Sequence, residues 1–323
     1  MKISIAMATY NGARYIQEQL QSFVDQTRLP DELIITDDGS TDHTEAIVRD
    51  FAKSAPFAVE FHRNEKNLGY CGNFNGALMK TTGDLVFLSD QDDVWFPEKI
   101  QHMLMVAELN PQAMVVMNDA ALTDGDLSEV GLTKIGQMRS AGFGMESFVM
   151  GCCCAVRREF LDLVLPIPEG YRSHDNWLVA IANGLNARTI EFQVLQYYRR
   201  HGSNESQFIV NRTTKLTRLD RLLESLRRVR RTDDPEMAQM YINQSRIFAT
   251  GLQNIIVDAP SQYRNALVEL MEQSHIRADG LEKRASIRSK TLFPRITSAS
   301  RYLFSGGYAV QNGLKSFARD LLG

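Results

Sequence analysis

The sequence contains no run of about 18 or more apolar residues, the length that a membrane-spanning helix needs. It also lacks the longer apolar region and the cleavage site of a signal peptide, because a strand-like pattern begins at Ile3. Cysteine is scarce: three of the four are consecutive, Cys152 to Cys154, and such a run does not make a disulfide framework. We therefore expect a protein without a membrane span that works in a reducing cytoplasm.

Internal repeats and low-complexity segments are also absent from the 323 residues. Apolar residues make up 44% and charged residues 23% of the chain, which excludes wholesale disorder and fibrous repeats. The length suits one large domain or two.

Charge is divided unevenly along the chain. Residues 1–205 carry 17 basic and 28 acidic side chains, whereas residues 206–323 carry 19 basic and 11 acidic ones. This switch predicts a first domain over 1–205 and a basic, mainly helical region over 206–323. The acidic first region argues against nucleic acid as its ligand and is compatible with a metal site that receives a phosphorylated ligand.

Strand and helix patterns alternate in the first region. Apolar strand patterns cover 3–8, 33–36, 57–63 and 85–88, and helical spacing covers 13–26, 41–51 and 72–80. This alternation predicts an α/β fold with a mostly parallel sheet covered on both faces. Later segments predict strands over 114–118, 150–156 and 194–199, a loop over 124–144, and helices over 177–183, 216–231, 236–257 and 263–284.

Polar motifs follow three of the predicted strands. They are Thr9-Tyr10-Asn11-Gly12, Asp37-Asp38-Gly39-Ser40 and Asp90-Gln91-Asp92-Asp93. Ligands of open α/β sheets bind at the carboxyl ends of strands, so three such motifs together indicate a binding site.

The third motif favours a divalent cation, because three carboxylates at the edge of a core repel each other and Mg²⁺ and Mn²⁺ prefer oxygen ligands. The alternative is a solvated acidic loop that caps the next helix. The second motif is equally consistent with a turn plus helix cap and with a carboxylate that binds a base or ribose. The first motif is a turn or a base-stacking wall.

The ordered set of these motifs, with Asn67-Leu68-Gly69 between the second and third, resembles family 2 glycosyltransferases with the Rossmann-like GT-A fold. The resemblance covers residues 1–205. The segments from Ser89 to Trp95 and from Tyr198 to Asn204 are most similar to rhamnosyltransferase-like members that build bacterial surface polysaccharides.

The resemblance implies a role for each matched residue. Thr9 and Tyr10 would line the nucleotide base, Asp38 would hydrogen-bond it, and Asn11 and Asn67 would belong to the same donor site. A second set of implied residues surrounds the Mn²⁺ or Mg²⁺ ion: Asp92 as principal ligand, Asp90 facing the ribose or sugar, Asp93 binding directly or through water, and His201 as a further ligand. An exposed loop histidine is the alternative for His201.

The resemblance also places the catalytic base at Asp175, at the head of a helix, where it would take the proton of the acceptor hydroxyl. The alternative is that Asp175 only caps this helix. Gly151 would let the backbone approach the donor sugar and the acceptor. We expect Cys152 to Cys154 to be small core residues, because consecutive strand residues alternate between faces and chelate one ion poorly.

The implied activity is inverting transfer of one sugar from a dTDP- or UDP-sugar, such as dTDP-rhamnose, to a glycan or lipid-linked hydroxyl. Processive synthases have a Gln-x-x-Arg-Trp motif, and here Gln196 and Arg199 are followed by Arg200 instead of Trp. A nucleotidyltransferase and a non-catalytic nucleotide-sugar or glycan-binding module remain as alternatives.

Basic amphipathic segments distinguish the C-terminal region. The helix predicted over 212–231 suits either packing on the first domain or attachment to anionic lipid at the inner face of the plasma membrane. The basic and aromatic stretch 283–319 suits either an interfacial segment or a homodimer contact.

Overall fold

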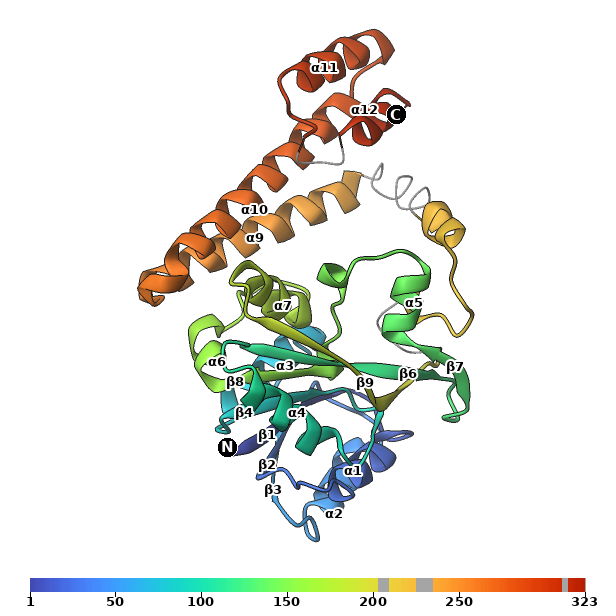
Figure 1. Cartoon of the computed structure of the whole chain (residues 1–323), viewed down its shortest axis with the longest axis vertical. Coiled ribbons are helices and arrows are strands. Elements are labelled where there is room, and N and C mark those ends of the chain that lie inside the picture. The colour runs from blue at the N-terminus through green and yellow to red at the C-terminus, as the bar shows by residue number, and fades with distance from the viewer. Residues whose placement is uncertain (203–208, 225–234, 310–312, 323) are drawn as a thin grey trace. The chain divides into compact units, whose positions relative to one another are not determined.

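A computed structural model describes residues 1–202, 209–224, 235–309 and 313–322 (Figure 1). The chain divides into two compact units, Met1–Arg221 and Leu222–Gly323. The predicted domain boundary at residue 205 and residues 225–231 of the helix predicted over 212–231 lie outside the described residues.

The first unit is built on a mixed sheet, which has nine strands within the described residues. The strand order is β3-β2-β1-β4-β8-β6-β9-β5, and β7 pairs with β6. The bounds are β1 Ile3–Thr9, β2 Glu32–Asp37, β3 Ala58–Arg63, β4 Leu85–Ser89, β5 Val94–Trp95, β6 Val115–Thr123, β7 Glu129–Thr133, β8 Cys154–Arg157 and β9 Arg188–Arg199.

Strand direction decides where the polar motifs meet. Neighbouring strands from β3 to β4 are parallel, and β6 is parallel to β9, whereas β8 runs antiparallel to both β4 and β6. The carboxyl ends of β1, β2, β4 and β9 therefore share one edge of the sheet with the amino end of β8. Thr9 pairs with Asp37 and Met7 with Ser89, so the three motifs begin at adjacent positions.

Helices cover both faces of this sheet (Figure 1). They are α1 Ile16–Val24, α2 Thr44–Phe51, α3 Gly69–Lys80, α4 Lys99–Leu109, α5 Lys134–Ser140, α6 Arg158–Val164 and α7 His174–Gly184. Alternate residues of β1, β2 and β4 form one core with α1, α2 and α4, while α3 contacts β1, β2 and α7. The predicted α/β architecture is confirmed.

Two predicted segments differ from the structure. The segment 124–144, predicted as a loop, contains β7 and α5, because Thr133 caps α5 by accepting a hydrogen bond from the Gly136 amide at 3.0 Å. The strand predicted over 150–156 begins only at Cys154, and Gly151–Cys153 forms a 3-10 turn. The cysteines therefore do not alternate between two faces of a strand.

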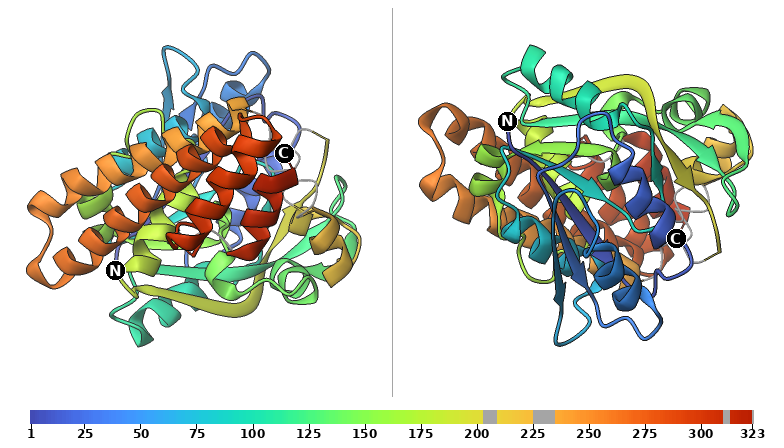
Figure 2. Two further views of the ribbon diagram at one scale, coloured as in Figure 1. Left: turned by 90° about the horizontal axis from the view of Figure 1, so that it is seen from above. Right: turned by 90° about the horizontal axis from the view of Figure 1, so that it is seen from below.

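The second unit is helical. Helix α9 (Pro235–Asp258) and helix α10 (Ser261–Arg288) form a long hairpin, which is seen from two further sides in Figure 2. Helices α11 (Leu292–Phe304) and α12 (Leu314–Leu322) follow and pack against each other. The predicted C-terminal helical region is confirmed, and among the described residues no helix is both long and apolar enough to cross a membrane.

Candidate active site

Gln91 ties the loop after β4 to the loop after β1. The Tyr10 amide donates to Oε1 of Gln91 at 2.9 Å, and Nε2 of Gln91 donates to the Tyr10 carbonyl at 3.0 Å. A Cβ atom at Gly12 would lie 2.2 Å from the same Oε1, so only glycine allows this approach. The acidic loop is therefore fixed against the first motif.

Asp92 and His201 form a close pair at this edge. Oδ2 of Asp92 lies 2.7 Å from Nε2 of His201, and the His201 ring stacks on Tyr15 with centroids 4.6 Å apart. Arg199 holds the backbone of Asp92. This side chain is 2% exposed, and its Nε donates to the Asp92 carbonyl at 2.8 Å. The loop after β9 is thereby brought to the acidic loop after β4.

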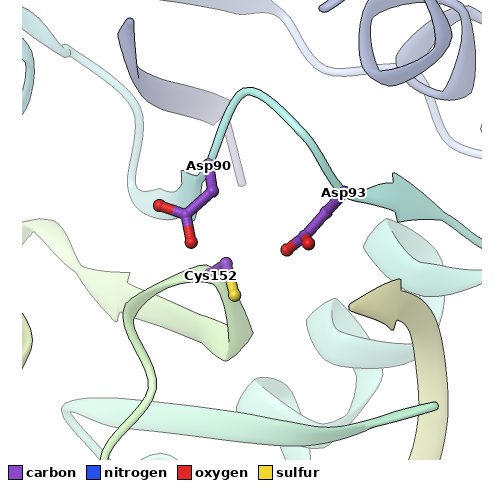
Figure 3. A group of neighbouring side chains, drawn as sticks. All are labelled: Asp90, Asp93 and Cys152. Atoms are coloured by element: carbon purple, nitrogen blue, oxygen red, sulfur yellow. The ribbon is translucent and has the colours of Figure 1, made fainter. Parts of the chain in front are cut away.

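Asp90, Asp93 and Cys152 form a second cluster beside this pair (Figure 3). One ligand atom from each of the three lies within 4.8 Å of the others. Burial and the charge of Asp92 raise the pKa of Asp90 to about 7, and the same two causes raise the pKa of Asp93 well above its usual range. Burial also raises the pKa of the Cys152 thiol, which therefore stays protonated and hydrogen-bonds these carboxyl groups.

This donor set fits a hard divalent cation. Asp90 and Asp93 are neighbouring carboxyl groups whose charged forms are disfavoured by burial and by the charge of Asp92, so both gain from a bound cation. Their oxygens, with an imidazole nitrogen alongside, suit Mn²⁺ or Mg²⁺, whereas the protonated thiol of Cys152 does not. The acidic loop is thus a candidate metal-binding group.

A buried hydrogen-bond network orients the carboxyl group of Asp93. Lys99 is fully buried; its Nζ donates to Oε1 of Gln196 and, at 2.9 Å, to the Cys152 carbonyl. Nε2 of Gln196 then donates to Oδ2 of Asp93 at 2.9 Å, and the Arg199 amide donates to Oδ1 at 3.2 Å. Side chains from α4 and β9 therefore orient this carboxyl group.

Replacing Lys99 by methionine is expected to lower the free energy of unfolding by about 2–4 kcal/mol. The variant keeps the length of the side chain but leaves two buried acceptors, on Gln196 and Cys152, without their donor. Urea denaturation measures the loss, with Lys53→Met, at an exposed position of the same unit, as the control. A loss below about 0.5 kcal/mol would contradict this account of the network.

Asp175 stands in the first turn of α7, next to the acidic loop. Its Oδ1 accepts hydrogen bonds from Oγ of Ser173 at 2.6 Å and from the Asn176 amide at 2.8 Å. After burial and Asp92, the charge of Asp175 is a further cause of the raised pKa of Asp90. A Cβ atom at Gly151 would lie 3.5 Å from Cβ of Asp175, so the backbone just before Cys152 passes close to Asp175.

Asp38 lies at the end of β2 and is 3% exposed. Its Oδ1 accepts from Nδ2 of Asn64 at 2.7 Å and from the Leu68 amide at 3.1 Å, while Nδ2 of Asn67 donates to the Asp38 carbonyl at 3.3 Å. The hydrogen bonds from Asn64 and Leu68 therefore reach the same carboxylate oxygen. The residues between β3 and α3 therefore set its orientation.

The first motif is divided between buried and exposed side chains. Thr9 is 1% exposed and its hydroxyl donates to Oδ2 of Asp37 at 2.8 Å, so this side chain holds the turn. Tyr10 is 51% exposed beside it. Asn11 has a φ of 48°, and its amide donates to Oγ of Ser40 at 2.8 Å, which joins the first two motifs.

The structure gathers the predicted site residues at one edge of the sheet. Four side chains that sequence reasoning assigned no role now support them: Gln91, Lys99, Gln196 and Arg199. The signals available were the position of Gln91 inside the acidic motif and the Gln196-x-x-Arg199 spacing on β9.

Comparison with known proteins gives this site its context. The profile of glycosyl transferase family 2 matches residues 4–164. An uncharacterized glycosyltransferase of Nostoc sp. is 30% identical over 232 residues, covering 67% of this chain and 70% of the relative. The dTDP-rhamnosyl transferase RfbG of Shigella flexneri is 26% identical over 225 residues, covering 66% of this chain and 78% of the relative.

Solved structures show the same fold. A fragment of TarS from S. aureus in complex with UDP-GlcNAc matches 99% of this chain and 88% of its own length, with a TM-score of 0.59 and 16% identity. The predicted GT-A fold is thereby confirmed. The chain belongs to glycosyl transferase family 2, as its motifs predicted.

Proposed function

We propose that this protein is a metal-dependent inverting glycosyltransferase that moves one sugar from a nucleoside-diphosphate donor to a hydroxyl group of a glycan or lipid-linked acceptor. The observation that carries the proposal is the placement of two groups at one sheet edge. Asp90 and Asp93 lie beside Cys152, and Asp175 lies beside the preceding residue, Gly151. Membership of family 2 favours glycosyl over nucleotidyl transfer.

The proposed reaction divides the work between these two groups. Asp175 takes the proton of the acceptor hydroxyl as its oxygen bonds to the anomeric carbon and the bond from that carbon to the diphosphate oxygen breaks. The hydrogen bond from Ser173 to Oδ1 of Asp175 fixes the carboxylate for this step. A Mn²⁺ or Mg²⁺ ion, held by Asp92 and Asp90 with His201 and Asp93 in support, would neutralise charge on the leaving nucleoside diphosphate.

We assign the base-binding part of the donor site to the first two motifs. Asp38 would accept a hydrogen bond from a base N–H, Tyr10 would stack on the base, and Asn11 and Asn67 would hold the surrounding loops. Thr9 would line the floor through its backbone, because its side chain is turned to Asp37. Uracil and thymine present the same N–H to such a carboxylate, so both UDP- and dTDP-sugars fit.

The similarity to RfbG, described as a dTDP-rhamnosyl transferase, supports dTDP-rhamnose as the donor to test first. The resemblance of the segments from Ser89 to Trp95 and from Tyr198 to Asn204 to members that build bacterial surface polysaccharides supports an acceptor of that class, at the cytoplasmic side of the membrane.

A thermal-shift screen with UDP, dTDP, GDP and CMP, each with and without Mn²⁺, tests the donor site. We expect a pyrimidine diphosphate to stabilise the protein only when Mn²⁺ is present, since the acidic loop repels a free diphosphate. A ligand at 100 times its Kd should add about 2.7 kcal/mol to the stability. Stabilisation by GDP alone, or equal stabilisation without metal, would contradict the proposed donor site.

A further inference from the structure

Helix α11 presents large apolar side chains to solvent. Phe293 is 80% exposed and Phe304 is 89% exposed, and they stand 11 residues apart, about three helical turns, on one face. Ile296, 40% exposed, lies on the same face one turn after Phe293. The neighbouring helix α12 adds Leu314, which is 70% exposed.

Charge along the stretch 283–323, which contains α11 and α12, is nearly all of one sign. Residues 283–323 contain eight basic side chains and one acidic side chain, Asp320. Asp320 is fully buried, and its carboxylate accepts from Nε of Arg284 at 2.9 Å, from Nη2 of Arg284 at 3.0 Å and from the Tyr308 hydroxyl at 2.8 Å. Arg301 on α11 and Lys315, which follows Leu314 on α12, are exposed as well.

We propose that this α11–α12 surface, made of Phe293, Ile296, Phe304 and Leu314 with the cations Arg301 and Lys315, binds the surface of an anionic lipid bilayer. The aromatic rings would enter the headgroup region while the two cations meet lipid phosphates. The buried pairing of Arg284 with Asp320 joins α10 to α12, so the side chains are presented by a preassembled unit.

The charge pattern favours lipid over a second copy of the chain. In a two-fold symmetric dimer the same surface would face itself, and cations would oppose cations without an exposed carboxylate from this stretch to compensate them. An anionic bilayer supplies the missing negative charge. The inference is independent of the proposed donor and catalytic base, because it concerns only the helical unit.

Vesicle cosedimentation of the full-length chain tests the proposal. The vesicles are phosphatidylcholine alone, or phosphatidylcholine with roughly a third of phosphatidylglycerol. We expect binding to the anionic vesicles only. The double variant Phe293→Ser/Phe304→Ser should bind at least about tenfold more weakly, and Arg301→Gln/Lys315→Gln should also bind at least about tenfold more weakly.

The matched control is Val257→Ser, at a position in α9 that is 70% exposed but outside the surface. It should bind as the unchanged protein does, and circular dichroism should give the same helix content for every variant. Two results would overturn the proposal: no binding of the unchanged protein to anionic vesicles at low salt, or a dimer in solution that Phe293→Ser/Phe304→Ser converts to a monomer. A thermal-shift measurement with nucleotide on the same samples shows separately whether the donor site binds nucleotide.

Discussion

Asp175→Asn is expected to lower kcat by about a hundred- to ten-thousandfold while donor binding changes by less than about twofold. The amide keeps the size of the side chain and can still accept the hydrogen bonds from Ser173 and Asn176, so the first turn of α7 should keep its shape. It cannot take a proton from the acceptor hydroxyl. Turnover of dTDP- or UDP-sugar with a glycan acceptor, together with calorimetric titration of the nucleotide, measures both quantities.

Asp162→Asn is the matched control, because this carboxylate is 65% exposed on α6. It should leave both quantities unchanged. Full turnover by Asp175→Asn would remove Asp175 as the base and leave it the role of a helix cap. Absence of turnover in the unchanged protein with every donor and acceptor would favour a binding module.

Asp92→Asn is expected to abolish the Mn²⁺-dependent part of nucleotide binding and to lower kcat by about a hundredfold or more. Oδ2 of Asp92 lies 2.7 Å from Nε2 of His201, and in the proposed site Asp92 is the principal ligand of the cation, so losing its charge weakens cation binding. Titration of nucleotide with and without Mn²⁺, and turnover before and after treatment with a chelator, measure the effect.

Asp50→Asn, at a side chain that is 82% exposed on α2, is the control and should behave as the unchanged protein does. Nucleotide binding by Asp92→Asn that still rises with Mn²⁺ to the original extent would place the ion on Asp90 and Asp93 instead. Activity that survives complete chelation would contradict metal dependence altogether.

The local sequence pattern was sufficient to predict much of the fold of the first unit. The strands β1, β2 and β4 are buried on both faces, so they appear in the sequence as continuous apolar runs, and each ends in a polar motif. A parallel sheet then brings those motifs together without further information. The acidic loop and the adjacent Asp38 were predictable in the same way.

The errors arose where tertiary contacts override local pattern. Cys152, Cys153 and Cys154 look like part of an apolar strand, but Gly151 begins a 3-10 turn that places Cys152 against Asp90 and Asp93. The segment 124–144 is rich in residues typical of loops, yet β7 gains its hydrogen bonds by pairing with β6.

The buried residues that support the site had little local signal, because even the Gln196-x-x-Arg199 spacing does not show which groups these side chains contact. Lys99 reads as an ordinary surface residue of an amphipathic helix, and it is buried only because Gln196, 97 positions later, accepts its hydrogen bond. Arg199 likewise reaches the Asp92 carbonyl across 107 positions. Such long-range pairings depend on the register of β9, which strand propensity does not determine.

The pairing of Gln91 with the Tyr10 backbone has a thermodynamic consequence. Its two hydrogen bonds join the loop after β1, which would contact the base, to the loop after β4, which would hold the ion. The two loops are therefore expected to move together. Ordering either loop by one ligand then lowers the conformational entropy that the other ligand must still remove. Cation and nucleotide would therefore bind with positive cooperativity, and by linkage each would raise the affinity for the other by the same factor.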